Sequence, residues 1–434
     1  MDWREDYQRK LTTAEEAVKI FKDNDVIGVV GGTAIPPAIS EALGKRGPEL
    51  KNIKICQGFA LAFHEYMKPE HKETFHIETI FMGPAERYCL QLGTADFVPC
   101  HLGNMGDWLV DAGCNAGACV VTPPDENGWM NRSCFGGLAP QRVIDQLDRL
   151  IVEVNENTPW LCSDGFKIHV SQCDHIVENH IPIFEIPEIP ITPIEEEIAG
   201  RIAEMVPDGS TIQLGLGGLA NCIGHFLTHK KDLGVHAEVI SNSIMDLIKC
   251  GAVNNSKKTL HPGKVAYTFC VGTRQLMDFL HHNETFQAFE IDYINNPSII
   301  AQNDNLVSIN NALMFDLTGQ AASESIGTFQ YSATGGQVAF VNGSQKSRGG
   351  KSILALPATR TDKDGKMQSR IVAKLPEGTV VTTSRNDVEW VVTEFGAVKL
   401  TNKSLSWRAK NLITLAHPDF RDELTFNAKK IGWL

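Results

Sequence analysis

The sequence predicts an α/β protein of two open, mainly parallel α/β domains of related topology. Three observations support this fold class. Apolar runs of strand length alternate with helix-like stretches, a proline-rich segment interrupts the pattern near residue 181, and the pattern then restarts. Two related sheets would leave a cleft between them, so we expect the active site at the interface of the domains.

Length and composition fit two soluble globular domains. The chain has 434 residues, of which 42% are apolar, 21% charged and 8% aromatic. A single core rarely extends over that length, so two domains are the natural expectation. The formal net charge is -12, with no run of five like charges, which argues against a nucleic-acid surface and needs no special acidic partner.

Cysteine usage and the amino-terminal residues indicate a cytoplasmic protein. The eleven cysteines are scattered and contain no CxxC pair, as expected for reduced thiols. The opening residues MDWREDYQRK alternate charges where a signal peptide would be apolar, and no run of 18 apolar residues occurs. We therefore expect no membrane partner and a cytoplasmic location.

The first predicted domain covers residues 1–185. Thr13 and Glu16 form a capping-box pattern that opens a helix extending through Phe21. A second helix is predicted over 142–150. Strands are predicted at DVIGVV, IKICQG, HIETIF, GACVVT and LIVEVN, and their continuous hydrophobicity indicates that both faces of the sheet are covered.

The second predicted domain covers residues 186–434. The segment IPIFEIPEIPITPIEEEIAG (181–200) contains four prolines, which exclude a regular helix or central strand before Glu195, so we expect a crossing between domains. After it come a helix to Met205, the strand TIQL, a glycine turn, a helix to about Leu227 and an apolar strand. Aligning Ile27 with Ile212 suggests a duplication, although chance similarity remains open.

One carboxylate lies inside an apolar strand, in LGVHAEVISNS (233–243). Burying Glu238 there without a partner would cost several kcal/mol, so a functional reason is expected. Upstream, residues 215–220 fit G-x-G-x-x-A between a strand and a helix. This motif leaves three interpretations open: a nicotinamide dehydrogenase with Glu238 on the ribose, a site for another phosphate or acyl ligand, or tight packing.

A second glycine cluster, SATGGQVAF (332–340), precedes an expected polar loop, NGSQKSRGGK, and the strand SILALP. Adjacent glycines let backbone N–H groups approach a ligand oxygen, although such loops are often only mobile surface. Glu394 then repeats the pattern of Glu238 at the end of the apolar strand VEWVVTEFG. Two such acids favour a site at the carboxyl edge of a sheet. We reject HVSQCDH (169–175) as a metal site, because strand spacing separates its histidines.

Ten segments together resemble one family. The chain is similar to the class I coenzyme A transferases of the acetyl-CoA hydrolase/transferase group, nearest to the 4-hydroxybutyrate and butyryl-CoA:acetate transferases. The resemblance spans nearly the whole chain, through the segments MDWREDY, VVTPPDENGW, IVEVNENTP, QLGLGG, LGVHAEVIS, DYINNP, GGQVAF, GGKSILALP, VTTSRNDVEWVVTEFG and RAKNLITLAHPDFRDEL.

The resemblance implies a ping-pong mechanism. Glu238 would attack an acyl-CoA thioester to give a mixed anhydride and free CoA thiolate. The thiolate would then attack the glutamyl carbonyl to give an enzyme-CoA thioester, and an incoming carboxylate would reverse the sequence. Removal of water makes a carboxylate more nucleophilic, which supports the assignment. No metal and no cofactor are implied, since CoA is a substrate; the partners would be a short acyl-CoA and acetate, and the chain would form a homodimer or larger homo-oligomer.

The resemblance also suggests roles for other residues. Asn295 and Glu394 match polar residues near the nucleophile, and the two glycine clusters could donate to an oxyanion. Lys351, with Ser352, would face the CoA phosphates on simple electrostatic grounds. The candidates are catalytic Glu238, Asn295 and Glu394; oxyanion or substrate-binding Gln213, Gly215, Gly217, Gly218, Gly335, Gly336 and Gln337; and CoA-binding Lys351 and Ser352.

Departures from the family pattern leave the acyl group open. Residues 218–223 lack a proline that is common in the family, and Ser241, Asn242 and Ser243 replace the more usual S-D-G. An acyl-CoA hydrolase would use the same intermediate with water as the acceptor. A dehydrogenase should instead bind NAD and leave Glu238 unacylated, and a non-catalytic CoA-binding sensor is the remaining alternative.

Overall fold

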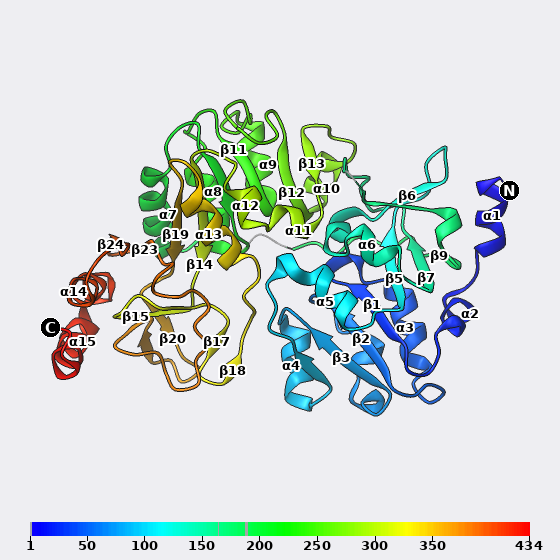
Figure 1. Ribbon diagram of the computed structural model, residues 1–434, viewed down its shortest axis with the longest axis horizontal. Helices are drawn as coiled ribbons and strands as arrows, with labels where there is room; N and C mark the ends of the chain where they lie inside the picture. The colour runs from blue at the N-terminus through cyan, green and yellow to red at the C-terminus, as the bar shows by residue number, and fades with distance from the viewer. Residues whose placement is uncertain (1, 164, 187–189) are drawn as a thin grey trace. The chain divides into compact units, whose positions relative to one another are not determined.

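The computed structural model describes residues 2–163, 165–186 and 190–434 and divides into two compact units (Figure 1). The first unit contains Met1–Ile186 and Ala266–Ile294, and the second contains Pro187–Val265 and Asn295–Leu434. The proline-rich crossing expected from the sequence includes residues 187–189, which lie outside the described residues. Within the described part of the chain, no helix has the length and apolar character needed to cross a bilayer.

The first unit is built on a seven-stranded, fully parallel sheet in the order β4-β3-β2-β1-β5-β7-β9. All six residues of β5 are buried, which explains its continuous hydrophobicity. The strands are β1 (Val26–Val30), β2 (Ile53–Gln57), β3 (Phe75–Thr79), β4 (Ala95–Phe97), β5 (Ala116–Val121), β7 (Arg149–Val154) and β9 (His175–Glu178), with a separate antiparallel pair, β6 (Trp129–Asn131) and β8 (Lys167–His169).

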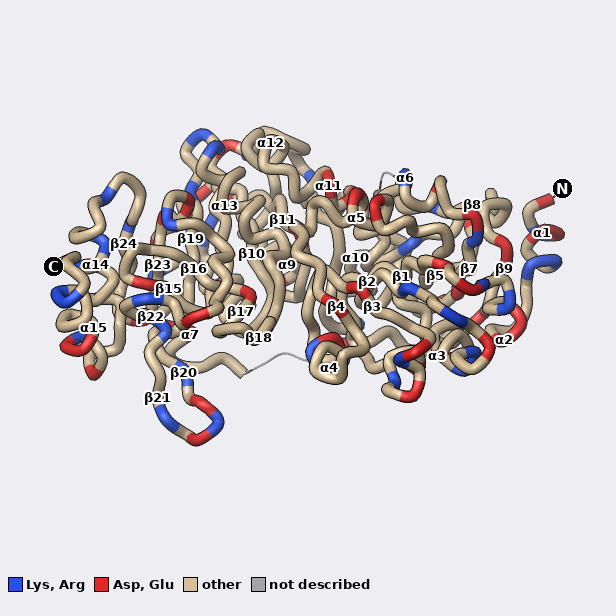
Figure 2. The backbone as a smooth tube through the Cα atoms, turned by 60° about the horizontal axis from the view of Figure 1, so that its bottom comes forward, with Lys and Arg blue, Asp and Glu red and all other residues tan. Residues whose placement is uncertain are grey.

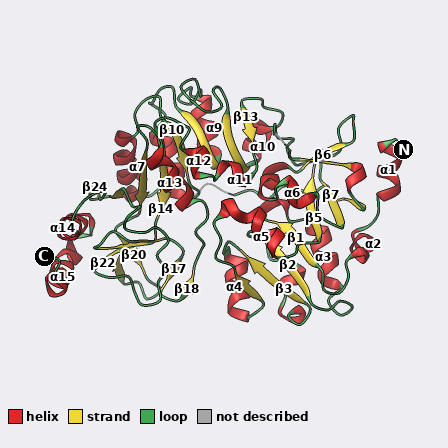
Figure 3. Cartoon of the chain, viewed as in Figure 1, coloured by secondary structure: helices red, strands yellow, loops and turns green. Residues whose placement is uncertain are grey.

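Helices alternate with these strands (Figure 3). They are α1 (Trp3–Lys10), α2 (Ala14–Ala17), α3 (Pro37–Lys45), α4 (Pro84–Leu92), α5 (Met105–Asp111) and α6 (Gln141–Ile144). Short 3-10 helices are η1 (Val18–Ile20), η2 (Gly32–Ala34), η3 (Glu65–Met67), η4 (Pro69–His71), η5 (Leu102–Asn104), η6 (Ser133–Leu138) and η7 (Val170–Gln172). The later segment of this unit begins at Ala266, the second residue of β12 (Val265–Cys270), and contains α10 (Arg274–Leu280), β13 (Phe286–Ala288) and α11 (Ile291–Ile294).

The second unit repeats this arrangement. Its strands follow the order β11-β10-β14-β19-β23-β24, in which only β24 is antiparallel to its neighbour. The first five have the same connectivity as β2-β1-β5-β7-β9, which confirms the expected related topology. The strands are β10 (Thr211–Leu214), β11 (Gly234–Ile240), β14 (Leu306–Asn311), β19 (Lys351–Ala355), β23 (Trp390–Thr393) and β24 (Gly396–Lys399).

The second unit also carries seven α-helices and several short strands among its described residues. The helices are α7 (Pro193–Met205), α8 (Gly218–Phe226), α9 (Asn242–Lys249), α12 (Pro297–Ile300), α13 (Gln337–Lys346), α14 (Leu405–Leu415) and α15 (Pro418–Ile431). A small sheet contains β16 (Ala321–Ala322), β15 (Met314–Asp316) and β22 (Ile371–Val372), and two hairpins pair β17 (Ser325–Ile326) with β18 (Phe329–Gln330) and β20 (Thr359–Thr361) with β21 (Met367–Ser369).

Two local predictions are wrong and one is only partly right. The helix predicted over 142–150 ends at Ile144, because Arg149 already begins β7. The loop predicted over 342–351 is helical up to Lys346, since α13 extends through it. Thr13 does cap α2 by accepting the N–H of Glu16, but that helix is only four residues long and continues as a 3-10 turn.

Candidate active site

Glu238 is the fifth of the seven residues of β11, in a strand whose apolar residues are buried. Strand side chains alternate between the two faces of a sheet. The His236 ring lies 6.2 Å from that of Phe340 on α13, so this face of β11 is covered by α13. Glu238, two residues further on, projects from the same face, toward the amino-terminal end of α13.

Asn295 provides the hydrogen bond that orients the carboxylate. Its Nδ2 donates to Oε2 of Glu238 over 2.6 Å, and the side chain is 3% exposed. The adjacent Asn296 caps α12 by accepting the N–H of Ser298, with Pro297 in the first helical turn, and this fixes the backbone next to Asn295. Asn295 Oδ1 is buried and makes no hydrogen bond to a described residue.

Gly336 lies against the other side of the same carboxylate. A Cβ built on Gly336 would be 1.9 Å from Oε2 of Glu238 and 2.6 Å from Nδ2 of Asn295. The φ of Gly336 is -95°, which any residue can adopt, so the close approach and not the backbone conformation requires glycine. Its neighbour Gly335 has a φ of +55°, which does favour glycine.

Burial controls the charge state of Glu238. Removal of water raises the pKa of its carboxyl to about 7, and the hydrogen bond from Asn295 opposes that rise. The carboxyl is therefore ionised in a large fraction of molecules at neutral pH while losing much of its hydration. Strongly perturbed pKa values of this kind are typical of reactive groups in active sites.

The first glycine turn lies at the end of the neighbouring strand. Ile212 of β10 pairs with Val235 of β11, and three residues further along each strand come Gly215 and Glu238. Gly217 caps α8 with a φ of +109°, and a Cβ on Gly218 would lie 2.9 Å from Oε1 of Glu195. The structure thus brings both turns to the carboxyl edge of one sheet, where helix amino termini offer N–H donors.

The two candidate glutamines have protein partners. The amides of Gln213 and Asn310 bond reciprocally, over 3.2 and 3.0 Å, and join β10 to β14. Gln337 donates to the carbonyl of Asn311 over 2.8 Å and accepts from the hydroxyl of Thr383 over 3.2 Å. Sequence reasoning missed these three partners, although the pair Asn310 and Asn311 at the end of an apolar strand was an available signal.

Three candidates do not lie beside Glu238. Glu394 follows β23, four strands from β11 and thus about 19 Å away at the usual strand spacing. Both of its carboxylate oxygens accept the N–H of Ala358, at 2.9 and 3.2 Å. Lys351 and Ser352 begin β19 at the opposite edge of the sheet, where Nζ of Lys351 donates to the carbonyl of Met205 over 2.9 Å.

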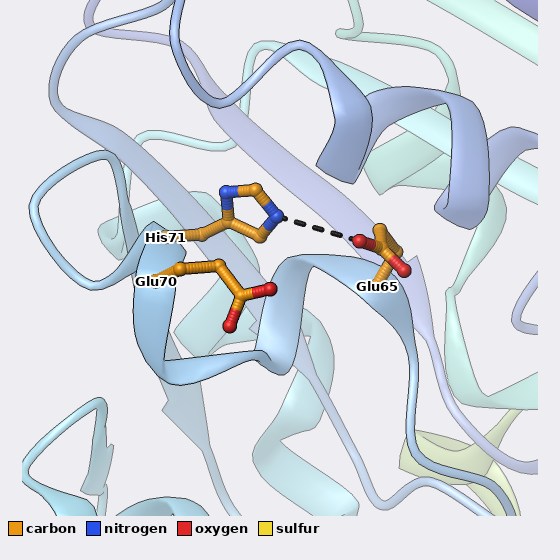
Figure 4. A group of neighbouring side chains, drawn as sticks. All are labelled: Glu65, Glu70 and His71. Carbon is orange, nitrogen blue, oxygen red and sulfur yellow. Dashed lines mark ion pairs between the residues drawn. The ribbon is translucent and has the colours of Figure 1, made fainter.

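One group of possible metal ligands occurs among the described residues, in the first unit. Ligand atoms of Glu65, Glu70 and His71 lie within 4.8 Å of one another (Figure 4). Glu65 already pairs with Lys68 at 2.7 Å and with His71 at 3.5 Å. Because Lys68 compensates the charge of Glu65, the arrangement is explained without a metal, and we assign none.

Comparison with known proteins identifies the family. The acetyl-CoA hydrolase/transferase N-terminal domain matches residues 1–187 and the corresponding C-terminal domain matches residues 272–428; Glu238 lies between the two ranges. The 4-hydroxybutyrate coenzyme A transferase of Clostridium kluyveri is 38% identical, with 99% of this chain and 100% of that protein covered.

Other relatives also match over nearly their full length. The succinyl-CoA:cyclohexane-1-carboxylate CoA transferase of Geobacter metallireducens is 40% identical, with 99% of this chain and 97% of that protein covered. The butyryl-CoA:acetate CoA-transferase of Anaerostipes caccae is 36% identical, with 99% of this chain and 98% of that protein covered. The crystal structure of RipA from Yersinia pestis superposes over 100% of both chains with a TM-score of 0.92 at 35% identity. The chain therefore belongs to the acetyl-CoA hydrolase/transferase family and is an enzyme of the CoA-transferase type.

Proposed function

We propose that the protein transfers CoA between a short-chain acyl-CoA, of the 4-hydroxybutyryl or butyryl type, and acetate, through a thioester on Glu238. The observation that carries the proposal is the partly buried carboxylate with a pKa of about 7, contacted by the amide of Asn295 and the backbone of Gly336. The named substrates of the relatives from Clostridium and Anaerostipes support the acyl class.

The first half-reaction forms the enzyme thioester in two displacements. An oxygen of Glu238 attacks the thioester carbonyl carbon, the C–S bond breaks, and CoA leaves as a thiolate. That thiolate attacks the glutamyl carbonyl of the mixed anhydride, forms a new C–S bond and releases the free carboxylate. Covalent capture in this way conserves the free energy of the thioester.

The second half-reaction is the reverse with acetate. Acetate attacks the glutamyl thioester, CoA thiolate leaves, and the thiolate then attacks the acetyl carbonyl of the anhydride to regenerate the Glu238 carboxylate. Each addition passes through a tetrahedral oxyanion, for which we propose backbone N–H donors of the turns at 217–218 and 335–336. Gln213, Gly215 and Gln337 would shape these turns.

Transfer requires no proton movement, whereas hydrolysis needs a base to activate water. Among the described residues, the hydrogen-bond donor to the Glu238 carboxylate is the amide of Asn295, and the backbone of Gly336 lies against it; neither group is a base. This favours acetate over water as the acceptor. It also gives Glu238 the role of covalent nucleophile, in place of the ribose-binding role that a nicotinamide dehydrogenase would require.

Mass spectrometry tests the proposal directly. Incubation with butyryl-CoA without acetate should leave CoA on the peptide that contains Glu238, and hydroxylamine should remove it as it cleaves thioesters. Glu238→Gln should abolish the adduct, while Cys250→Ser, at an exposed cysteine, should keep it. An adduct on a cysteine that dithiothreitol releases would overturn the mechanism, and thioester loss unaffected by acetate would identify a hydrolase.

A further inference from the structure

Two arginines lie on one face of the hairpin β20–β21, just beyond the carboxyl end of β19. Arg360 pairs with Gln368 across the hairpin, and the N–H of Arg370 donates to the carbonyl of Ala358 over 2.8 Å. Because side chains alternate along strands, Arg360, Gln368 and Arg370 share a face. The two arginines are therefore diagonal neighbours, close enough for long side chains to converge.

Neither guanidinium has an ion pair or a side-chain hydrogen bond with the residues that the structure describes, and Nε of Arg370 is buried without a hydrogen-bond partner. Burial and the positive charge of Arg360 lower the pKa of Arg370, whereas the nearby Tyr331 and Glu394 act in the opposite direction and raise it. The carboxylate of Glu394 is directed to the N–H of Ala358. Two adjacent cations with free donors fit a phosphate group well.

The position of this arginine pair suits a long substrate. β19 and β11 are three strands apart, about 14 Å at the usual spacing, and both the pair and Glu238 lie at the carboxyl edge of the sheet. In CoA the thiol and the phosphates are separated by the pantetheine arm, so a phosphate site must lie well away from the nucleophile. Lys351, the basic residue considered from the sequence, is at the opposite edge.

We propose that Arg360 and Arg370 bind a phosphate group of CoA, an assignment that rests on the proposed function. Figure 2 shows the other charges of the hairpin, which gather near its tip. Lys363, an exposed residue in that turn, has no part in the proposed contact and therefore offers a matched control.

The test compares two acyl donors that share the pantetheine thioester, of which only butyryl-CoA carries the 3′-phospho-ADP part with its phosphates. With butyryl-CoA and acetate, Arg360→Gln and Arg370→Gln should each lower kcat/KM about tenfold, and the double variant by more, because charged hydrogen bonds to phosphate are lost. With butyryl-pantetheine the same variants should match wild type, which also shows that they fold. Lys363→Gln should match wild type with both donors.

Butyryl-dephospho-CoA shows which phosphate is bound. If the pair holds the 3′-phosphate, the variants should match wild type with this donor; if it holds the pyrophosphate, they should lose activity with it as well. Equal losses with butyryl-CoA and butyryl-pantetheine, or no loss with either, would overturn the assignment.

Calorimetric titration with free CoA separates this assignment from the proposed function. If wild type shows transferase activity with neither donor, the proposed function fails while the arginine site is still tested. Weaker CoA binding in both variants, with Lys363→Gln unchanged, supports the site; unchanged binding refutes it.

Discussion

Replacing the Glu238 carboxyl by an amide should stabilise the protein at alkaline pH. Burial raises the pKa of this carboxyl from 4.5 to about 7 in the folded state. Each pKa unit corresponds to about 1.4 kcal/mol, so ionised Glu238 costs the folded state about 3 kcal/mol above pH 7. A glutamine is never ionised and can still accept the hydrogen bond from Asn295, so Glu238→Gln removes that cost.

The sign and the pH range follow from the two pKa values. Below 4.5 the carboxyl is protonated in both states and contributes no difference. Between 4.5 and about 7 the unfolded chain loses the proton while the folded protein keeps it, so wild-type stability falls as pH rises. The gain from Glu238→Gln should therefore grow across this range and stay constant at higher pH.

Urea unfolding at a series of pH values measures this gain. The midpoint of Glu238→Gln should lie above that of wild type at pH 8 and approach it near pH 4.5. Glu204→Gln, which changes an exposed acid on α7, should show no such pH-dependent difference. If Glu238→Gln were no more stable than wild type at pH 8, the carboxylate would not be paying a desolvation cost and the reasoning would be refuted.

Three further predictions concern catalysis. In wild type, kcat/KM for the acyl donor should rise with pH and be half-maximal near pH 7, since attack requires ionised Glu238; a flat profile would contradict this. Asn295→Ala should shift that midpoint upward, because the hydrogen bond lowers the pKa of Glu238; an unshifted midpoint would exclude that role. Gly336→Ala should lower kcat about a hundredfold or more, because the added Cβ would displace the carboxylate of Glu238. The control Gly200→Ala, whose Cβ would meet its nearest atom at 3.6 Å, should match wild type. A kcat of Gly336→Ala equal to that of wild type would disprove the close approach.

The strands, and a carboxylate buried at Glu238, could be predicted because their signals are local. Buried parallel strands need continuous apolar runs, and a carboxylate within such a run is anomalous whatever surrounds it. The contact between Gly336 and Glu238 could not be predicted in the same way. Nearly a hundred residues separate them, and the need for glycine arises from close approach and not from a turn conformation that sequence would reveal.

The two wrong local predictions also failed because contacts between residues distant in sequence decided the structure. Residues 142–150 contain both helix and strand formers, and β7 begins at Arg149 because its strand completes the sheet beside β5. Residues 342–346 look like a polar loop, but α13 continues through them where Gly343 packs closely on Ile300, with a Cβ there meeting that side chain at 2.5 Å. Tertiary packing thus overrode local propensity in both places.

Acids in apolar strands differ in which hydrogen-bond donors compensate the charge of the carboxylate. We expect this difference to distinguish structural carboxylates from reactive ones. Glu394 accepts the N–H of Ala358 with both oxygens, and buried Glu153 on β7 accepts the N–H of Ile39 at 3.1 Å as well as a side-chain amide. Such backbone donors are fixed in place and anchor the carboxylate. Among the described residues, Glu238 accepts one hydrogen bond, from the side-chain amide of Asn295, and its carboxylate occupies the space that a Cβ on Gly336 would fill. Because fixed backbone groups compensate the charge of Glu238 less than that of Glu394 or Glu153, we propose Glu238 and not the other two as the carboxylate that attacks the thioester.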